Sequence, residues 1–245
     1  MDELSFDGKR ALIVGGSSGI GNGIAQAYLA RGAECHVWGT RASPEDYANE
    51  AGSDLTGLHY TQMNVADISA VENYTPPFDT LDILVLCQGT VRYGREEFTR
   101  DGWDVVMDVN INSVMATAMK FREMLAGSKG SVVIVSSVAG FSSTKGNPAY
   151  SASKHAAVGL TKTLGEAWAP DGIRVNGLAP GLVETKLTKV TTDDPKRLAA
   201  SLRGIPMRRM GTPGDMAGVA LFLTSPLAAY VTGQTIIADG GLSLS

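Results

Sequence analysis

Short runs of apolar and β-branched residues recur along the chain and are separated by longer stretches of helical character. Several runs are apolar at consecutive positions, as in Ile83-Leu84-Val85-Leu86, which is typical of a strand covered on both faces. Strands that alternate with helices predict an α/β protein with a Rossmann fold, whose doubly wound, seven-stranded parallel sheet carries helices on both faces. The seven strands are expected at Ala11–Val14, Cys35–Trp38, Leu58–Met63, Leu81–Leu86, Ser131–Ser136, Arg174–Leu178 and Thr235–Ala238.

The chain has no repeat and no interdomain linker, so residues 1–245 are interpreted as a single dinucleotide-binding and catalytic domain. Its least patterned stretch is 186–214, which three prolines interrupt, namely Pro195, Pro206 and Pro213. Between Lys186 and Arg209 it holds seven basic residues against Asp193 and Asp194. This stretch is interpreted either as a lid over a site or as a solvated helix with an ordinary charge excess.

Composition narrows the class of protein. Hydrophobic residues make up 44% of the chain, which suffices for a substantial core, and the net charge of -4 gives no basic stripe for a nucleic acid. Cys35 and Cys87 lie in apolar runs that read as buried strands, so no disulfide framework is expected. No apolar leader and no run of membrane-spanning length is present, which predicts a cytoplasmic protein with no membrane partner. No metal site is predicted.

A glycine-rich turn comes directly after the first predicted strand. Gly15-Gly16-Ser17-Ser18-Gly19-Ile20-Gly21 leads into a helix expected at Gly23–Ala30. Glycine lets the backbone approach a pyrophosphate closely, and the helix N-terminus stabilises its negative charge. The position at the first strand-to-helix junction favours a dinucleotide site over a plain flexible loop.

Tyr150 and Lys154 are four residues apart near the start of a predicted helix, so they share one helix face. An ammonium near a phenol favours the phenolate and would lower the tyrosine pKa from its usual ~10. Such a group can exchange a proton with a substrate oxygen while a hydride is transferred. The alternative is a solvated helix face with no chemistry.

Several motifs together resemble the short-chain dehydrogenase/reductase family. Gly15-x-x-x-Gly19-x-Gly21 is similar to its Thr-Gly-x-x-x-Gly-x-Gly turn, with Val14 at the threonine position. Ser137, thirteen residues before Tyr150, is similar to its catalytic serine, and Asp108-Val109-Asn110 to its asparagine segment. The resemblance covers essentially the whole chain and extends to 3-oxoacyl-carrier-protein reductases and related alcohol dehydrogenases. It implies the same Rossmann fold.

The resemblance also implies roles for four catalytic residues. Tyr150 is the general acid/base, Ser137 hydrogen-bonds the substrate oxygen, Lys154 supports Tyr150, and Asn110 holds a water in a proton relay to the lysine. The simpler interpretations are a turn hydroxyl at a strand end for Ser137 and a buried asparagine at a helix kink for Asn110.

A larger set is implied to contact the cofactor. Its members are Gly15, Ser17, Ser18, Gly19, Ile20, Gly21, Thr40, Arg41, Asn64, Val65, Gln88, Gly89, Tyr150, Lys154, Pro180, Gly181, Val183 and Thr185. Leu86-Cys87-Gln88-Gly89 stands where the family usually has Asn-Asn-Ala-Gly, so Gln88 would add bulk beside the cofactor ribose. Val14 and the segment Leu86-Cys87-Gln88 replace two polar elements that support each other in the family, and losing both is expected to cost less than losing one and orphaning its buried partner.

Cofactor choice depends on the residues directly after the second strand. NAD-preferring relatives place an acidic residue there, whereas this chain has Gly39, with Thr40 and Arg41 next. A hydroxyl and a guanidinium suit the oxygens of a 2′-phosphate, which favours NADP(H). NAD(H) stays open, because Arg41 could simply begin a solvated loop.

The predicted function is hydride transfer between NAD(P)(H) and a small-molecule carbonyl or secondary alcohol. One alternative is a dinucleotide-binding sensor or scaffold without turnover. Another is a 3-oxoacyl thioester on a carrier protein, disfavoured because Ser128-Lys129 and Asp171 stand where such reductases usually present arginines. Arg92, Tyr93, Ser142, Asn147 and the lid are expected to shape the pocket. The resemblance of the C-terminal segment, with Gly233-Gln234 and Asp239-Gly240-Gly241, implies a homo-oligomer, a tetramer or possibly a dimer.

Overall fold

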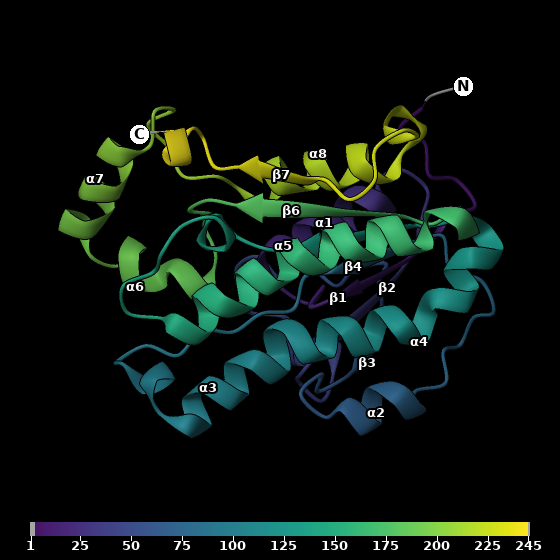
Figure 1. The fold of residues 1–245 in the computed structure, drawn as a ribbon, viewed down its shortest axis with the longest axis horizontal. Coiled ribbons are helices and arrows are strands. Elements are labelled where there is room, and N and C mark those ends of the chain that lie inside the picture. Colours follow the sequence, from purple (N-terminus) through teal and green to yellow (C-terminus); the bar gives the residue numbers. More distant parts are fainter. Residues whose placement is uncertain (1–2, 245) are drawn as a thin grey trace.

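Seven parallel strands form one sheet in the computed structural model, which describes residues 3–244 (Figure 1). The strand order is β3-β2-β1-β4-β5-β6-β7, so the chain reverses its direction of travel across the sheet between β1 and β4. Ligands of open parallel sheets bind beyond the carboxyl ends of the strands at such a switch point. The strands are β1 (Arg10–Val14), β2 (Glu34–Gly39), β3 (His59–Gln62), β4 (Ile83–Leu86), β5 (Ser131–Val135), β6 (Arg174–Pro180) and β7 (Thr235–Ala238).

Helices cover both faces of this sheet, as the sequence predicts. In Figure 1 the long helices α4 and α5 lie in front of the strands, α1 and α8 lie behind them, and α6 and α7 extend beyond the sheet on the left. The α-helices are α1 (Gly19–Leu29), α2 (Ile68–Asn73), α3 (Arg100–Met107), α4 (Ser113–Ser128), α5 (Pro148–Trp168), α6 (Lys189–Thr192), α7 (Pro195–Gly204) and α8 (Pro213–Thr224).

Neighbouring residues of one strand supply two different cores. Leu12 and Val14 of β1 belong to the apolar cluster that contains α4 and α5 residues such as Phe121. Ala11 and Ile13 belong to the opposite cluster, which α1 and α8 complete. Side chains alternate between the faces of a strand, so a strand covered on both sides must be apolar throughout.

The predicted strand positions are confirmed to within two residues at each end. The first helix differs more, because it begins at Gly19 rather than at Gly23. The glycine turn and the first turn of the helix therefore overlap, which brings the helix N-terminus to the turn itself. Cys35 lies in β2 as predicted, whereas Cys87 comes directly after β4 instead of lying inside a strand, and both cysteines are free.

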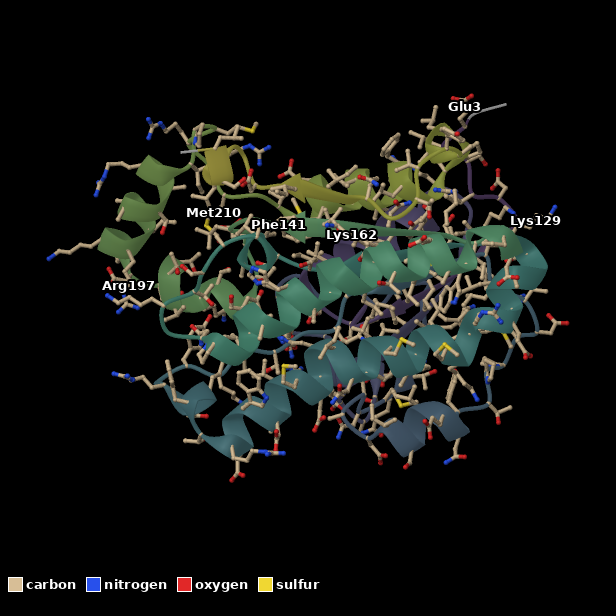
Figure 2. The ribbon with its side chains drawn as sticks, in the orientation of Figure 1. Glu3, Lys129, Phe141, Lys162, Arg197 and Met210 are labelled. Atoms are coloured by element: carbon tan, nitrogen blue, oxygen red, sulfur yellow. The ribbon has the colours of Figure 1, made fainter. Side chains whose placement is uncertain are left out.

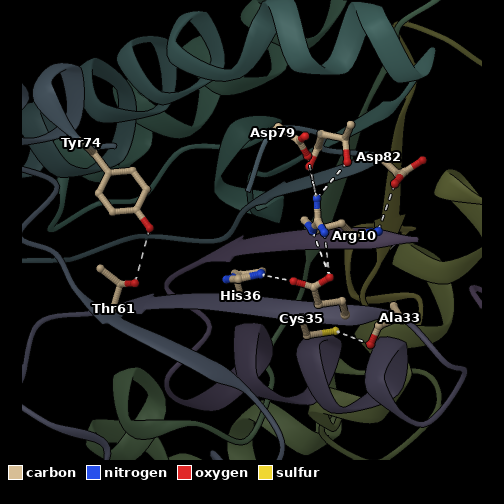
Figure 3. Close-up of polar contacts among 10 residues, drawn as sticks. Arg10, Ala33, Cys35, His36, Thr61, Tyr74, Asp79 and Asp82 are labelled. Carbon is tan, nitrogen blue, oxygen red and sulfur yellow. Dashed lines mark hydrogen bonds and ion pairs between the residues drawn. The ribbon is translucent and has the colours of Figure 1, made fainter. Parts of the chain in front are cut away.

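Charged groups tie strands together at the amino-terminal edge of the sheet (Figure 3). The Arg10 guanidinium donates to Glu34 Oε2 at 2.9 Å, and Asp82 accepts the backbone N–H of Arg10 at 3.0 Å. His36 Nε2 lies 2.8 Å from Glu34 Oε1, and the His36 ring stacks on His59. Glu34, His36 and His59 are thus close enough to consider as ligands, but the carboxylate already holds Arg10. Hydrogen bonds from Arg10 and His36 lower the pKa of Glu34 to about 2.

None of the helices within residues 3–244 is long and apolar enough to cross a membrane.

Candidate active site

The glycine turn lies at the carboxyl end of β1 and has a backbone that excludes side chains. Gly15 has a φ of +76°, in the left-handed region that favours glycine. A Cβ on Gly21 would lie 2.2 Å from the Gly15 carbonyl oxygen, so the turn closes only with glycine there. Ser18 is the N-cap of α1, and its side chain makes no capping hydrogen bond. First-turn amides of a helix lack intrahelical acceptors, which makes this end suited to an anion.

The two altered motifs beside the turn pack against each other. Val14 and Leu86 are register partners in β1 and β4, and both are fully buried in one apolar cluster. This pair therefore carries no polar group that lacks a partner, whereas in the same altered segment Gln88 Oε1 is buried without a hydrogen-bond partner among residues 3–244. Gln88 Nε2 donates to Ser113 Oγ of α4 at 3.0 Å, and Gln88 is 6% exposed. Its side chain is thus tied to α4 rather than directed only toward the expected ribose.

A cavity of about 980 Å³ extends along the carboxyl ends of the strands from the glycine turn to α5. It is large enough for a cofactor and a substrate together. Of the predicted catalytic and cofactor-contacting residues, Arg41 and Asn110 do not line it, and of the four residues expected to shape the substrate pocket, Arg92 lines it whereas Tyr93, Ser142 and Asn147 do not. The predicted catalytic and cofactor-contacting residues that do line it are Gly15, Ser17, Ser18, Gly19, Ile20, Gly21, Thr40, Asn64, Val65, Gln88, Gly89, Ser137, Tyr150, Lys154, Pro180, Gly181, Val183 and Thr185.

Arg41 is held beside the cavity by neighbours that the sequence did not indicate. Its guanidinium contacts the Glu50 carboxylate and lies 4.5 Å from the centre of the Tyr47 ring. Glu50 lines the cavity and also contacts Lys186 at the start of the 186–214 segment. A carboxylate thus joins the end of β2 to that segment, and no motif in the sequence singled out Glu50.

Three of the four predicted catalytic residues meet at the other end of the cavity. Ser137 lies just beyond β5, while Tyr150 and Lys154 lie in the first two turns of α5. Ser136 Oγ donates to the Lys154 carbonyl oxygen at 2.8 Å, which joins the strand end to the helix. Lys154 Nζ donates to the Val135 carbonyl oxygen at 2.9 Å and lies 5.7 Å from the centre of the Tyr150 ring.

Burial controls the protonation of this pair. Burial raises the pKa of the Tyr150 phenol above its usual value, and a hydrogen bond with the Ser137 hydroxyl opposes the rise. Burial lowers the pKa of the Lys154 ammonium to about 8. The expected lowering of the Tyr150 pKa by Lys154 is not found here: burial raises this pKa, and the Lys154 ammonium donates to the Val135 carbonyl oxygen instead. A raised pKa favours the protonated form of the Tyr150 phenol at neutral pH.

Asn110 lies in a π-helical turn, Asp108–Asn112, between α3 and α4. Its Oδ1 accepts the Thr90 N–H at 2.7 Å, and its Nδ2 donates to Thr90 O at 2.9 Å and Ser153 Oγ at 3.1 Å. A Cβ on Gly89 would lie 3.6 Å from Lys154 Nζ and 3.8 Å from Asn110 Oδ1, so the amide and the ammonium flank one point of the backbone. Asn110 is therefore a buried asparagine at a helix irregularity, located behind the cavity wall near Lys154. π-Helical turns occur frequently at functional sites.

A buried carboxylate next to Tyr150 escaped the sequence analysis. Glu97 is 1% exposed and accepts the Tyr150 N–H at 2.9 Å through Oε2. Its Oε1 accepts the Arg92 N–H at 3.0 Å and Asn147 Nδ2 at 3.2 Å. Arg92 and Asn147 are among the residues expected to shape the substrate pocket. The Glu96-Glu97 pair gave no sequence signal, because two adjacent acids ordinarily indicate a solvated turn.

The segment at 186–214 contributes one wall of the cavity. Lys186, Leu187, Thr188, Lys189, Thr192, Asp193 and Pro213 line it. The Tyr93 hydroxyl donates to the Leu187 carbonyl oxygen at 2.9 Å and joins this wall to the loop after β4. Farther along, Arg197 extends outward from α7, at the end of the molecule opposite Lys129 (Figure 2). The basic residues thus divide between the cavity and the outer surface.

Comparisons with known proteins agree with this architecture. The family model described as Enoyl-(Acyl carrier protein) reductase matches residues 14–243. A 3-oxoacyl-[acyl-carrier-protein] reductase of Chlamydia pneumoniae is 35% identical over 98% of this chain and 99% of its own length. A 2-dehydro-3-deoxy-D-gluconate 5-dehydrogenase of Bacillus subtilis (strain 168) is 36% identical over 98% and 96%, respectively.

A solved structure matches the whole chain. It is a putative 2-deoxy-d-gluconate 3-dehydrogenase from Agrobacterium tumefaciens with bound NADP, at 35% identity, a TM-score of 0.89 and full coverage of both chains. The sequence identities, the coverage and the parallel sheet with its glycine turn all agree: this chain is an oxidoreductase of the short-chain dehydrogenase/reductase family, similar to 3-oxoacyl-carrier-protein reductases.

Proposed function

We propose that this protein transfers a hydride between NADP(H) and the carbonyl or secondary alcohol of a small substrate, with Tyr150 as general acid/base. The observation that carries the proposal is the single cavity with the glycine turn at one end and Ser137, Tyr150 and Lys154 at the other. One end suits the phosphates of a dinucleotide, and the other holds a proton donor.

The residues present fit a nicotinamide dinucleotide. The turn at 15–21 and the α1 N-terminus hold its pyrophosphate, Asn64 and Val65 contact its adenine, and residues 180–185 its nicotinamide end. Bound there, the dinucleotide supplies or accepts the hydride. Gly89 lies close to Lys154 Nζ, 3.6 Å from the position of a Cβ there. The predicted contacts of Gln88 and Thr40 belong to the same proposal.

Each catalytic side chain then has a separate task. In carbonyl reduction Tyr150 donates its proton to the substrate oxygen, and the Ser137 hydroxyl donates a hydrogen bond to the same oxygen. The raised pKa of Tyr150 keeps the phenol protonated, which suits this direction. Lys154 holds a positive charge beside the site and, with Asn110 close by, replaces the proton through water. In alcohol oxidation the same groups act in reverse.

The preference for NADP(H) rests on the end of β2. Gly39 leaves no carboxylate at the position where an acid repels a 2′-phosphate, and Thr40 lines the cavity. Arg41 reaches the phosphate by exchanging its contact with Glu50 for one with the phosphate oxygens. The bound NADP of the Agrobacterium relative supports this choice.

The substrate we favour carries a carboxylate. Arg92 and Lys189 line the cavity, and within residues 3–244 no ion pair is formed by either side chain. The names of two relatives above specify gluconate derivatives, which are acids. The segment 186–214 is proposed to act as the lid of this pocket.

A thioester on a carrier protein is the second candidate, supported by the 35% identity to the Chlamydia reductase. The two surface turns that would present cations lie together, since a Cβ on Gly172 would be 3.1 Å from Lys129 Cγ. Asp171 in this pair of turns already binds Arg122. Among the described residues of these turns, an acidic carrier therefore meets one free cation, Lys129, which favours the free acid as substrate.

The predicted homo-oligomer remains a proposal. Met115 and Met119 lie one turn apart on α4 and are 38% and 50% exposed. Ile237 of β7, the last strand, is 38% exposed. These apolar positions suit contacts with a second copy of the chain.

A panel of carbonyl compounds tests the function and separates the alternatives. NADPH and NADH are each offered with 5-keto-D-gluconate, acetoacetate, ethyl acetoacetate and acetoacetyl-coenzyme A, and cofactor absorbance is monitored. We expect NADPH consumption with the two carboxylates. Consumption with the thioester alone favours the carrier-protein candidate. If the protein binds NADPH but consumes it with none of these compounds, nor with a wider set of ketones, the sensor or scaffold alternative is favoured.

A further inference from the structure

The N-terminus of α5 lacks the usual local cap. Asn147 is its N-cap residue, and its side chain makes no capping hydrogen bond. Pro148 is the first helical residue and has no N–H, and the N–H of Tyr150, the third residue, is one of the two donors that a cap normally satisfies. Glu97 Oε2 accepts this N–H at 2.9 Å from another segment of the chain.

The other Glu97 oxygen holds the loop at Arg92, which lines the same cavity as Tyr150. Oε1 accepts the Arg92 N–H and Asn147 Nδ2, and Asn147 Nδ2 also donates to the Arg92 carbonyl oxygen at 2.8 Å. All three partners of the carboxylate are N–H donors, which is the set that an ionised carboxylate accepts. A carboxylate at a helix N-terminus is also stabilised by the helix dipole.

We infer that Glu97 is a positioning residue for catalysis: its buried carboxylate fixes the Tyr150 backbone and the Arg92 loop relative to each other. The inference rests on the proposed function of Tyr150. It adds a residue that joins the proton donor to the substrate wall, and it explains why a buried acid lies between two pocket elements. Glu97 itself lies behind the Tyr150 backbone and acts through it.

Charged and titratable groups from several elements surround the Tyr150 phenol. Lys154 lies on the same helix, Tyr93 and Glu97 come from the segment after β4, and Ser137 lies just beyond β5. Arg92, Lys186 and Lys189 line the same cavity. Tyr93 and Glu97 both raise the pKa of Tyr150, in addition to the larger effect of burial. Removing the Glu97 charge therefore lowers the pKa of Tyr150.

Three variants separate charge from position. Glu97→Gln removes the charge and keeps the size of the side chain. Glu97→Asp keeps the charge and shortens the reach to the Tyr150 N–H. Glu96→Gln is the matched control, because Glu96 is the adjacent, exposed acid. For each variant, NADPH affinity is measured by fluorescence, and kcat and KM for the best panel ketone are measured against pH.

In reduction the phenol is the active form, so activity falls as pH rises through the pKa of Tyr150. For Glu97→Gln we expect this fall about half a pH unit or more nearer neutrality and a kcat lower by about 10-fold. Glu97→Asp lowers kcat about as much and leaves the pH midpoint in place. NADPH affinity stays within about twofold in both, and Glu96→Gln resembles the wild type.

The tyrosinate absorbance provides a readout that does not depend on turnover. The titration of Tyr150 is the difference between each protein and the same protein with Tyr150→Phe, and its midpoint falls in Glu97→Gln only. A wild type that reduces no ketone contradicts the proposed function, while this titration still tests Glu97. The inference is overturned if the wild type is active and Glu97→Gln does not differ from Glu96→Gln. The quantities compared are kcat, the midpoint of the pH profile and the midpoint of the tyrosinate titration. Equal midpoint shifts in Glu97→Asp and Glu97→Gln overturn the role of charge.

Discussion

The two ends of the cavity are built by different means. At the glycine turn the backbone forms the surface, and the neighbouring Val14 and Leu86 keep their pairing although both are apolar. At the α5 end the surface consists of individual side-chain atoms, such as the Tyr150 phenol and the Ser137 hydroxyl, and the buried Glu97 carboxylate holds the Tyr150 backbone from behind. The first end therefore tolerates a coordinated change of polarity and no added Cβ, whereas the second depends on single functional groups.

The largest expected effect is the loss of one atom at the α5 end. Tyr150→Phe removes the transferable proton and keeps the ring, so kcat falls by at least about 100-fold while NADPH affinity is retained. Tyr74→Phe is the control, because the Tyr74 hydroxyl contacts Thr61 outside the cavity and its loss leaves kcat unchanged (Figure 3). A variant that keeps more than about a tenth of wild-type kcat contradicts the acid/base assignment.

One added methyl group tests the backbone end. In Gly21→Ala the new Cβ would meet the Gly15 carbonyl oxygen, which must move, so we expect NADPH to bind roughly 10- to 100-fold more weakly. Gly218→Ala on α8 is the control, since a Cβ there meets no atom within 4 Å. Alanine in that helix raises the free energy of unfolding by about 0.5–1 kcal/mol. Fluorescence titration measures the NADPH affinity of each variant, and urea unfolding measures its free energy of unfolding. Tight NADPH binding by Gly21→Ala would show that the turn is more plastic than its geometry indicates.

The fold was predictable because the apolar pattern records both faces of each strand. Val132 and Val133 are neighbours in β5 and belong to opposite cores, which is why the run is apolar without interruption. The prolines that make 186–214 look unpatterned have a local explanation, since Pro195 and Pro213 begin helices α7 and α8. Asp194 and Thr212 cap these helices through their side chains, and the Asp-Pro and Thr-Pro pairs were the available signals.

The site was predictable where a local motif carries it and unpredictable where distant segments meet. Ser137, Tyr150 and Lys154 belong to two short motifs, and the structure gathers them at one end of the cavity. Glu97 reaches Tyr150 across 53 residues of sequence, so no local spacing reveals the contact. Glu50 likewise contacts Lys186 of the 186–214 segment. The pKa direction of Tyr150 was mispredicted because burial cannot be read from a four-residue spacing.

A substitution just after β2 tests whether a side chain at the cofactor end of the cavity selects NADPH over NADH. Arg41→Ala removes a charge-assisted contact worth about 1.5–3 kcal/mol, so NADPH affinity should fall roughly 10- to 100-fold while NADH affinity stays nearly unchanged. Arg31→Ala is the control, because the Arg31 guanidinium donates to the Ala27 carbonyl oxygen away from the cavity. Equal losses for both cofactors, or a higher kcat/KM of the wild type with NADH, would contradict the assignment of Arg41.

The smallest effect concerns the charges of the substrate wall. If Arg92 and Lys189 attract a carboxylate, salt weakens that attraction, because the Debye length falls from about 10 Å at 0.1 M to about 3 Å at 1 M. Over this range KM for acetoacetate should rise about threefold more than KM for ethyl acetoacetate, which has the same ketone without the charge. Lys189→Ala should reduce the difference, and Lys196→Ala should preserve it, since Lys196 lies on α7 outside the cavity. Equal salt sensitivity of the two ketones would assign the lid charges to solvated surface, and the substrate wall would then select by shape and hydrogen bonding alone.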